Sequence, residues 1–136
     1  MPDKTYKYKH VLLVDDSDLD NFINERIIES AHFCKNVYVS TSSKSALEFL
    51  NNIELIGDIS TNIYPEIIFI DINMPGINGF QFLDSILKMK NNNIKKCKLA
   101  ILTSSVHPSD YEKAKSISKD ITFIVKPLTV AILNEI

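Results

Sequence analysis

Short apolar runs alternate with longer amphipathic segments along the whole chain. The apolar runs have the length of strands and predict five of them, at residues 10–14, 36–40, 66–70, 99–102 and 121–125. The segments between them space apolar residues as helices do, which predicts helices at residues 17–31, 41–51, 80–93, 108–118 and 127–136. Ser17, and either Thr41 or Ser42, are the expected N-caps. Residues 52–64 are predicted to form a loop.

Most of the predicted strands are continuous apolar runs rather than alternating ones. The run at residues 67–70, for example, is apolar throughout. Strands of this kind are buried on both faces, which is typical of a parallel sheet with helices above and below it. The connections between such strands are expected to be right-handed. The sequence therefore predicts an α/β domain.

The composition is that of one globular domain. The 136 residues are 45% hydrophobic and 24% charged, with a net charge of -2. We expect a tail over residues 1–9 and one domain over residues 10–136. Arg26 is the single arginine beside fourteen lysines, which disfavours direct nucleic-acid binding. Neither a signal peptide nor a membrane span is indicated, and Cys34 and Cys97 have no metal-site spacing, so we expect a soluble, cytoplasmic protein.

Polar residues follow four of the predicted strands at their carboxyl ends. They are Asp15 and Asp16 after the first strand, Asp71 after the third, Thr103 at the end of the fourth and Lys126 after the fifth. The carboxyl ends of parallel strands share one edge of the sheet, where ligands of such sheets bind. Three carboxylates, a hydroxyl and an ammonium are therefore expected to meet.

Such a cluster of carboxylates needs a cation. Two carboxylates at roughly 4 Å repel by about 4 kcal/mol at an effective dielectric constant of 20. Oxygen ligands alone favour a hard ion, and Mg²⁺ is the natural occupant. If two carboxylates hold the metal, the third is free to attack phosphorus, while the lysine and the hydroxyl stabilise charge on the phosphoryl oxygens.

The same residues lie in motifs of a known family. The motifs are LLVDD at 12–16, IIFIDINMPGINGF at 67–80, ILTSS at 101–105 and FIVKP at 123–127. In this order and spacing they resemble the response-regulator receiver domain of two-component signal transduction, from about residue 10 to the end. The resemblance implies a flavodoxin-like, doubly wound, five-stranded parallel sheet in the order 2-1-3-4-5, with helices on both faces.

The resemblance also implies roles for individual residues. Asp71 would be the phosphoacceptor, assisted by Lys126 and Thr103. Asp15, Asp16, Asp71 and the backbone carbonyl of Asn73 would hold Mg²⁺. Thr103 and Phe123 would be the switch residues.

The implied function is signalling rather than turnover of a substrate. The donor would be a phosphohistidine of a sensor histidine kinase or a phosphotransfer protein, and the phosphorylated domain would bind a downstream protein target. We expect a monomer or a weak phosphorylation-dependent dimer, with no contact to nucleic acid or membrane. The domain would catalyse only its own phosphorylation and dephosphorylation.

Two other functions are weighed against this one. A phosphatase of the haloacid-dehalogenase type would need a second aspartate two residues after the nucleophile, where Asn73 stands. A degenerate receiver that binds partners without phosphorylation would not need the complete set of acceptor residues. The predicted last helix is short, so the natural protein either ends here or continues into an output domain.

Overall fold

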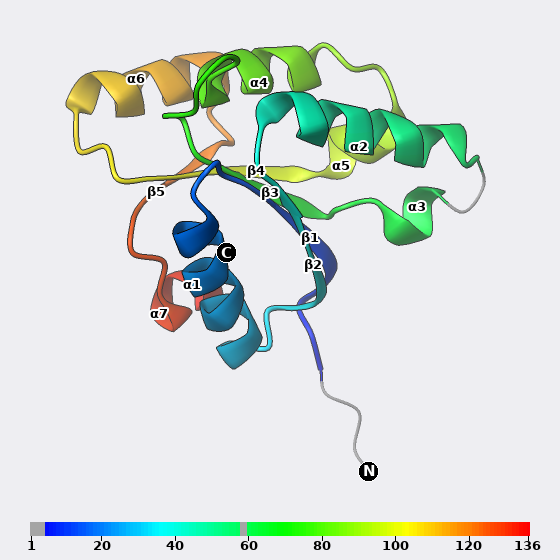
Figure 1. Cartoon of the computed structure of the whole chain (residues 1–136), viewed down its shortest axis with the longest axis horizontal. Helices are drawn as coiled ribbons and strands as arrows, with labels where there is room; N and C mark the ends of the chain where they lie inside the picture. The colour runs from blue at the N-terminus through cyan, green and yellow to red at the C-terminus, as the bar shows by residue number, and fades with distance from the viewer. Residues whose placement is uncertain (1–4, 58–59) are drawn as a thin grey trace.

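A five-stranded parallel sheet forms the centre of the molecule (Figure 1). The computed structural model describes residues 5–57 and 60–136. The strands are β1 (Tyr8–Val14), β2 (Cys34–Ser40), β3 (Ile67–Ile70), β4 (Lys98–Thr103) and β5 (Thr122–Val125). They lie in the order β2-β1-β3-β4-β5, which confirms the predicted flavodoxin-like fold. β1 begins two residues before the predicted strand because Tyr8 continues the register opposite Cys34.

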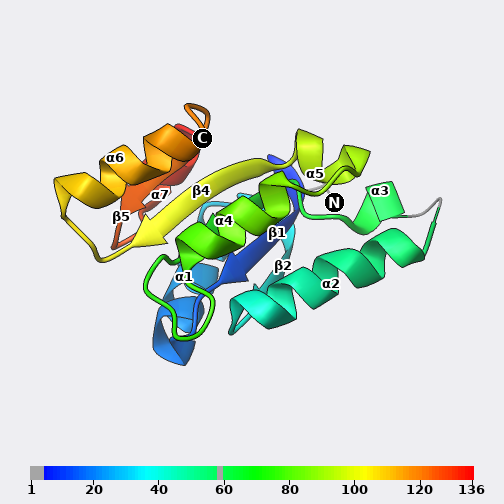
Figure 2. The same ribbon diagram turned by 90° about the horizontal axis from the view of Figure 1, so that it is seen from above.

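Helices cover both faces of the sheet (Figures 1 and 2). One face carries α1 (Asp18–Ser30) and α7 (Val130–Asn134). The other carries α2 (Ser43–Leu55), α3 (Ser60–Ile63), α4 (Gly79–Leu87), α5 (Asn92–Lys96) and α6 (Pro108–Ile117). Within the described part of the chain, no helix is long and apolar enough to cross a membrane.

The two faces of the sheet form two separate hydrophobic clusters. Successive residues of β1 point to opposite faces, so Leu12 belongs to the cluster under α2 and α4, whereas Leu13 belongs to the cluster under α1 and α7. Phe82 of α4 and Ile28 of α1 are both fully buried in their respective clusters. A strand that is buried on both faces needs apolar side chains at successive positions, which gives the continuous apolar runs seen in the sequence.

Two of the predicted N-caps are confirmed. The Ser17 side chain accepts a hydrogen bond from the Asp20 N–H, and the Ser42 side chain accepts one from the Ser45 N–H. α2 continues to Leu55, beyond its predicted end at residue 51. The predicted loop over residues 52–64 thus contains the end of α2 and all of α3, while residues 58–59 lie outside the described residues.

Two predicted helix boundaries are wrong. The helix expected to reach residues 91–93 ends at Leu87, and Asn91 is instead the N-cap of α5, because its side chain accepts a hydrogen bond from the Ile94 N–H at 2.7 Å. The last helix was expected to start at Pro127 but starts at Val130, where the Thr129 side chain provides the N-cap. The Lys126–Pro127 peptide bond is cis.

Candidate functional site

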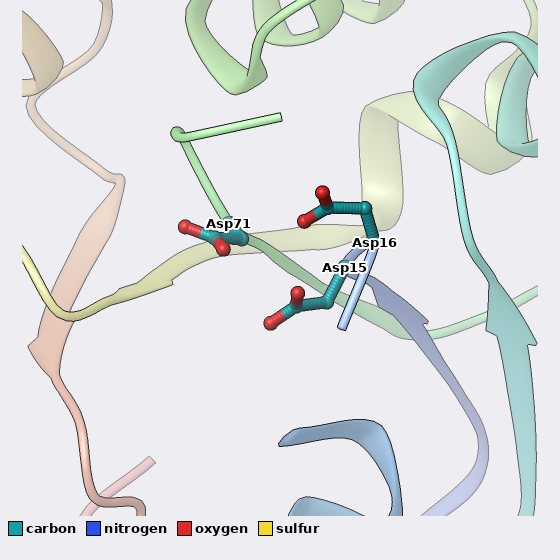
Figure 3. Close-up of side chains that lie close together, drawn as sticks. All are labelled: Asp15, Asp16 and Asp71. Atoms are coloured by element: carbon teal, nitrogen blue, oxygen red, sulfur yellow. The ribbon is translucent and has the colours of Figure 1, made fainter. Parts of the chain in front are cut away.

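Three carboxylates converge at the carboxyl edge of the sheet (Figure 3). Val14 of β1 is paired with Ile70 of β3, so the residues that follow these strands emerge side by side. Carboxylate oxygens of Asp15, Asp16 and Asp71 all lie within 4.8 Å of one another. Asp15 and Asp71 are buried, whereas Asp16 is exposed to solvent. The expected acidic cluster is therefore present.

Backbone hydrogen bonds fix the two buried aspartates. The Asp15 N–H donates to the Ser40 carbonyl at 3.1 Å, and the Asp71 N–H donates to the Val14 carbonyl at 2.9 Å, so both residues extend the hydrogen bonding of the sheet. The side chains are held as well. Asp15 Oδ1 accepts from the Ser17 N–H at 2.9 Å, and Asp71 Oδ1 accepts from the Asn73 N–H at 3.2 Å. The Asn73 backbone thus lies against the Asp71 carboxylate.

Lys126 brings a positive charge to the cluster from the end of β5. Its N–H donates to the Thr103 carbonyl at 2.7 Å. Its ammonium donates to Asp15 Oδ2 at 2.7 Å and to Asp20 Oδ2 at 2.8 Å, and lies 3.5 Å from Asp71 Oδ2. Burial opposes the ammonium charge, but the bonds to Asp15 and Asp20 and the charge of Asp71 outweigh it and raise the pKa of Lys126 above its ordinary value.

Asp71 is the carboxylate with the perturbed acidity. Burial raises its pKa above the ordinary aspartate value, and the charge of Asp15 adds to the effect. The Asn73 N–H and the Lys126 ammonium act in the opposite direction without cancelling it. Further positive charge beside Asp71 would favour its ionised form.

The donor set fits a hard divalent cation. Carboxylate oxygens are the ligands that Mg²⁺ prefers, and the exposed Asp16 leaves one side of the cluster open to the water that such an ion retains. The two buried carboxylates share a single ammonium, so a cation would relieve their repulsion. The residues present therefore fit a Mg²⁺ ion held by Asp15, Asp16 and Asp71.

Thr103 and Phe123 lie on the two neighbouring strands. Thr103 is fully buried at the end of β4, and its hydroxyl oxygen accepts a hydrogen bond from the Ser105 N–H at 3.2 Å. Phe123 is half-buried on β5, and its ring packs edge-on against Tyr111 of α6, with centroids 5.6 Å apart. Thr103 is thus part of the edge that carries the acids, whereas Phe123 contacts the helix beside it.

One residue of the site was not anticipated from the sequence. Asp20 stands at the start of a helix, where an acid is explained by the helix dipole alone, yet its carboxylate forms an ion pair with Lys126. The available signal was its position as the third residue of α1, because side chains at that position turn back toward the N-cap. Here the N-cap, Ser17, directly follows the acidic pair.

Comparisons with known proteins agree on one family. Residues 11–136 match the family described as the response regulator receiver domain. The two-component response regulator ARR17 of Arabidopsis thaliana is 31% identical over 128 residues, which cover 90% of this chain and 78% of ARR17.

Solved structures show the same likeness. A two-component response regulator from Cytophaga hutchinsonii has 37% sequence identity and a TM-score of 0.82, covering 95% of this chain and 93% of its own. The Mn²⁺-bound form of response regulator Rcp1, a protein of Synechocystis, has 21% identity and a TM-score of 0.69, covering 93% of this chain and 87% of its own. At that identity the Rcp1 likeness concerns the fold.

Proposed function

Because the chain belongs to the response regulator receiver domain family of two-component systems, we propose that it accepts a phosphoryl group on Asp71 in a Mg²⁺-dependent reaction. The donor is a phosphohistidine of a sensor histidine kinase or a phosphotransfer protein. The phosphorylated domain then changes its affinity for a downstream protein target.

One observation carries this proposal. Three carboxylates lie within 4.8 Å of one another, and the Lys126 ammonium lies 3.5 Å from one of them, Asp71. The stability of the fold does not explain why three aspartates lie together at this edge of the sheet, because repulsion among their carboxylates destabilises the folded state. An anionic group delivered to Asp71 would be stabilised by a metal cation and an ammonium close by, and this edge of the sheet supplies the ammonium and the carboxylates that would hold the metal.

The metal ligands in this proposal are Asp15, Asp16, Asp71 and the backbone carbonyl of Asn73. Bound Mg²⁺ neutralises charge on the phosphoryl oxygens and so lowers the repulsion between the phosphoryl group and the carboxylates. The Mn²⁺-bound form of Rcp1 is a protein of the same fold that binds a divalent ion, which supports this part of the proposal. Asp15 and Asp71 are held in place by the Ser17 and Asn73 N–H groups before any ion arrives.

In the transfer step, a carboxylate oxygen of Asp71 attacks phosphorus in line with the leaving imidazole. The new O–P bond forms as the P–N bond breaks, and its electron pair remains on the imidazole nitrogen. Lys126 neutralises one phosphoryl oxygen, and the Thr103 hydroxyl donates a hydrogen bond to another. Asp71 is 8% exposed, so the donor must approach along the open edge of the sheet.

The switch follows from the movement of Thr103. Once its hydroxyl turns to the phosphoryl group, space opens behind it, and Phe123 leaves Tyr111 and turns inward. The surface formed by α6, β5 and α7 then changes shape, and this surface is where the downstream target binds. The protein would be a monomer or a weak phosphorylation-dependent dimer, and such a dimer would use the same surface.

We assign the receiver domain to residues 10–136, with Tyr8 and Lys9 of the preceding tail extending β1. The domain acts catalytically only on its own phosphorylation and dephosphorylation. It acts through proteins rather than through nucleic acid or membrane, in keeping with a net charge of -2 and a single arginine. The free cysteines Cys34 and Cys97 suit the reducing cytoplasm.

Intact-mass spectrometry after incubation with acetyl phosphate and Mg²⁺ tests the proposal. We expect the wild type to gain one phosphoryl group, and the gain to disappear in Asp71→Asn or with a chelator. Asp84→Asn is the matched control, because Asp84 is an exposed acid of α4 that pairs with Lys88, and this variant should be phosphorylated normally. A wild type that gains no mass despite bound Mg²⁺ would instead indicate either a receiver that binds partners without phosphorylation or a strict requirement for its own donor protein.

A further inference from the structure

Asp20 uses its carboxylate on Lys126 rather than on its own helix. It is the third residue of α1, and its N–H donates to the Ser17 side chain at 3.2 Å. A glutamate or glutamine at this position commonly accepts a hydrogen bond from the N–H of the N-cap residue. Here the Ser17 N–H already donates to Asp15 Oδ1 at 2.9 Å. The Asp20 carboxylate is therefore free to reach across to β5, where it lies 2.8 Å from the Lys126 ammonium.

The Lys126 ammonium is consequently held on the α1 side of the site. An ammonium has three N–H donors, and two of them are used by Asp15 at 2.7 Å and Asp20 at 2.8 Å. The distance to Asp71 is 3.5 Å, which is longer than an ordinary N–H···O hydrogen bond. Lys126 thus contributes positive charge near Asp71 without a tight hydrogen bond to its carboxylate.

The two tight partners of Lys126 differ in their access to water. The Asp20 side chain is 37% exposed, whereas that of Asp15 is 6% exposed. If Lys126 moves toward a phosphoryl group, a released Asp20 can be solvated at once, but a released Asp15 would be left as a buried charge. Asp20 is therefore the partner that Lys126 can leave.

We propose that Asp20 is a positioning residue that holds Lys126 in a resting place beside α1 and competes for it with the phosphoryl group on Asp71. This inference rests on the proposed function and adds a residue to it. The Asp20 pair exists only while the site is empty of phosphoryl oxygen, so it stabilises the unphosphorylated state. Removing the Asp20 charge frees Lys126 and favours the phosphorylated state.

Beryllofluoride with Mg²⁺, a stable mimic of the phosphoryl group, provides the test. We expect Asp20→Asn to bind it about two to five times more tightly than the wild type, the range expected when a partly exposed ion pair no longer competes. Asp18→Asn is the matched control, because Asp18 is an exposed acid in the same first turn of α1 and its loss changes the net charge and the helix dipole equally. Asp20→Glu, which keeps the charge, should restore affinity close to that of the wild type.

A second measurement follows the lysine itself without Mg²⁺ or beryllofluoride. The NMR signal of the Lys126 ammonium should shift in Asp20→Asn and stay in place in Asp18→Asn. If Asp20→Asn binds beryllofluoride no more tightly than Asp18→Asn does, or leaves the Lys126 signal unmoved, the inference is wrong and the proposed function stands. A wild type that binds no beryllofluoride with Mg²⁺ would overturn the proposed function, and this inference with it.

Discussion

Gly79 begins α4 directly against the segment that carries Asp71. Its N–H donates to the Ile72 carbonyl at 3.2 Å, which brings the start of the helix back onto the end of β3. A Cβ at this position would lie 2.5 Å from the Asp71 carbonyl oxygen and 2.6 Å from Ile72 Cα. Both atoms belong to the backbone, so no side-chain rotation relieves the contact. Gly79→Ala must therefore move the chain next to the proposed acceptor.

The size of the effect can be worked from these distances. Ordinary van der Waals contact of a Cβ begins at 3.4 Å, so the new methyl group is about 0.9 Å too close to the Asp71 carbonyl. Overpacking of this kind costs about 1–3 kcal/mol, and the better helix propensity of alanine returns at most about 1 kcal/mol. We expect a net loss of about 1–2 kcal/mol in the free energy of unfolding. A shift approaching 1 Å at a reacting group lowers rates on the order of 100-fold.

Urea unfolding and the rate of phosphorylation by acetyl phosphate measure these two effects separately. The matched control is Gly57→Ala, at the far end of α2, where an added Cβ meets nothing within 4 Å but the backbone has a φ of +89°. The control should lose about 1–2 kcal/mol through its left-handed conformation and still be phosphorylated at the rate of the wild type. A Gly79→Ala protein with the urea midpoint and the phosphorylation rate of the wild type would refute the steric argument.

Three further substitutions test the site, the core and the response to pH. Mg²⁺ should raise the unfolding temperature of the wild type, because it binds the folded state, and should raise that of Asp16→Asn less; equal shifts would exclude Asp16 as a ligand. Phe82→Ala should lower the free energy of unfolding by about 3–5 kcal/mol, because Phe82 is fully buried, whereas Phe22→Ala, at a side chain that is 60% exposed, should change it by at most about 0.5 kcal/mol in urea unfolding. Burial raises the pKa of the Cys34 thiol from 9.0 to about 11, so this thiol ionises at lower pH in the unfolded chain than in the folded protein. The stability that the buried thiol contributes is therefore fully present below pH 9 and is lost as the pH rises toward 11. Cys34→Ala should reduce this decline of the urea midpoint at alkaline pH. A decline as steep as that of the wild type would show that ionisation of Cys34 does not cause it.

The sequence alone was sufficient to predict the parallel sheet and the position of the aspartates at its carboxyl edge. Continuous apolar runs specify strands buried on both faces, and a parallel sheet brings their carboxyl ends to one edge. Asp15 and Asp71 each follow such a run directly, so their proximity follows from the fold class without knowledge of any side-chain contact. The motifs that carry the family resemblance lie at the same strand ends.

Helix boundaries were predicted less well because local capping decides them. A run of three asparagines was interpreted as the end of a helix, yet Asn91 begins a new helix by accepting from the Ile94 N–H. Asparagine occurs both at the start and at the end of helices, so the residue type alone does not show which of the two it marks before β4. Likewise, Pro127 suits a first helical turn, but Thr129 is the residue whose side chain caps α7.

Only the tertiary structure decided which acids Lys126 binds. Asp20 and Lys126 are 106 residues apart in the sequence, and an acid at the start of a helix is explained locally by the helix dipole. The pair forms because the start of α1 and the end of β5 meet at the carboxyl edge of the sheet, and because the Ser17 N–H already donates to Asp15. Side-chain direction and competition among hydrogen-bond partners are set by packing in three dimensions, whereas the period of the apolar residues, and the strand ends it defines, can be read along the chain.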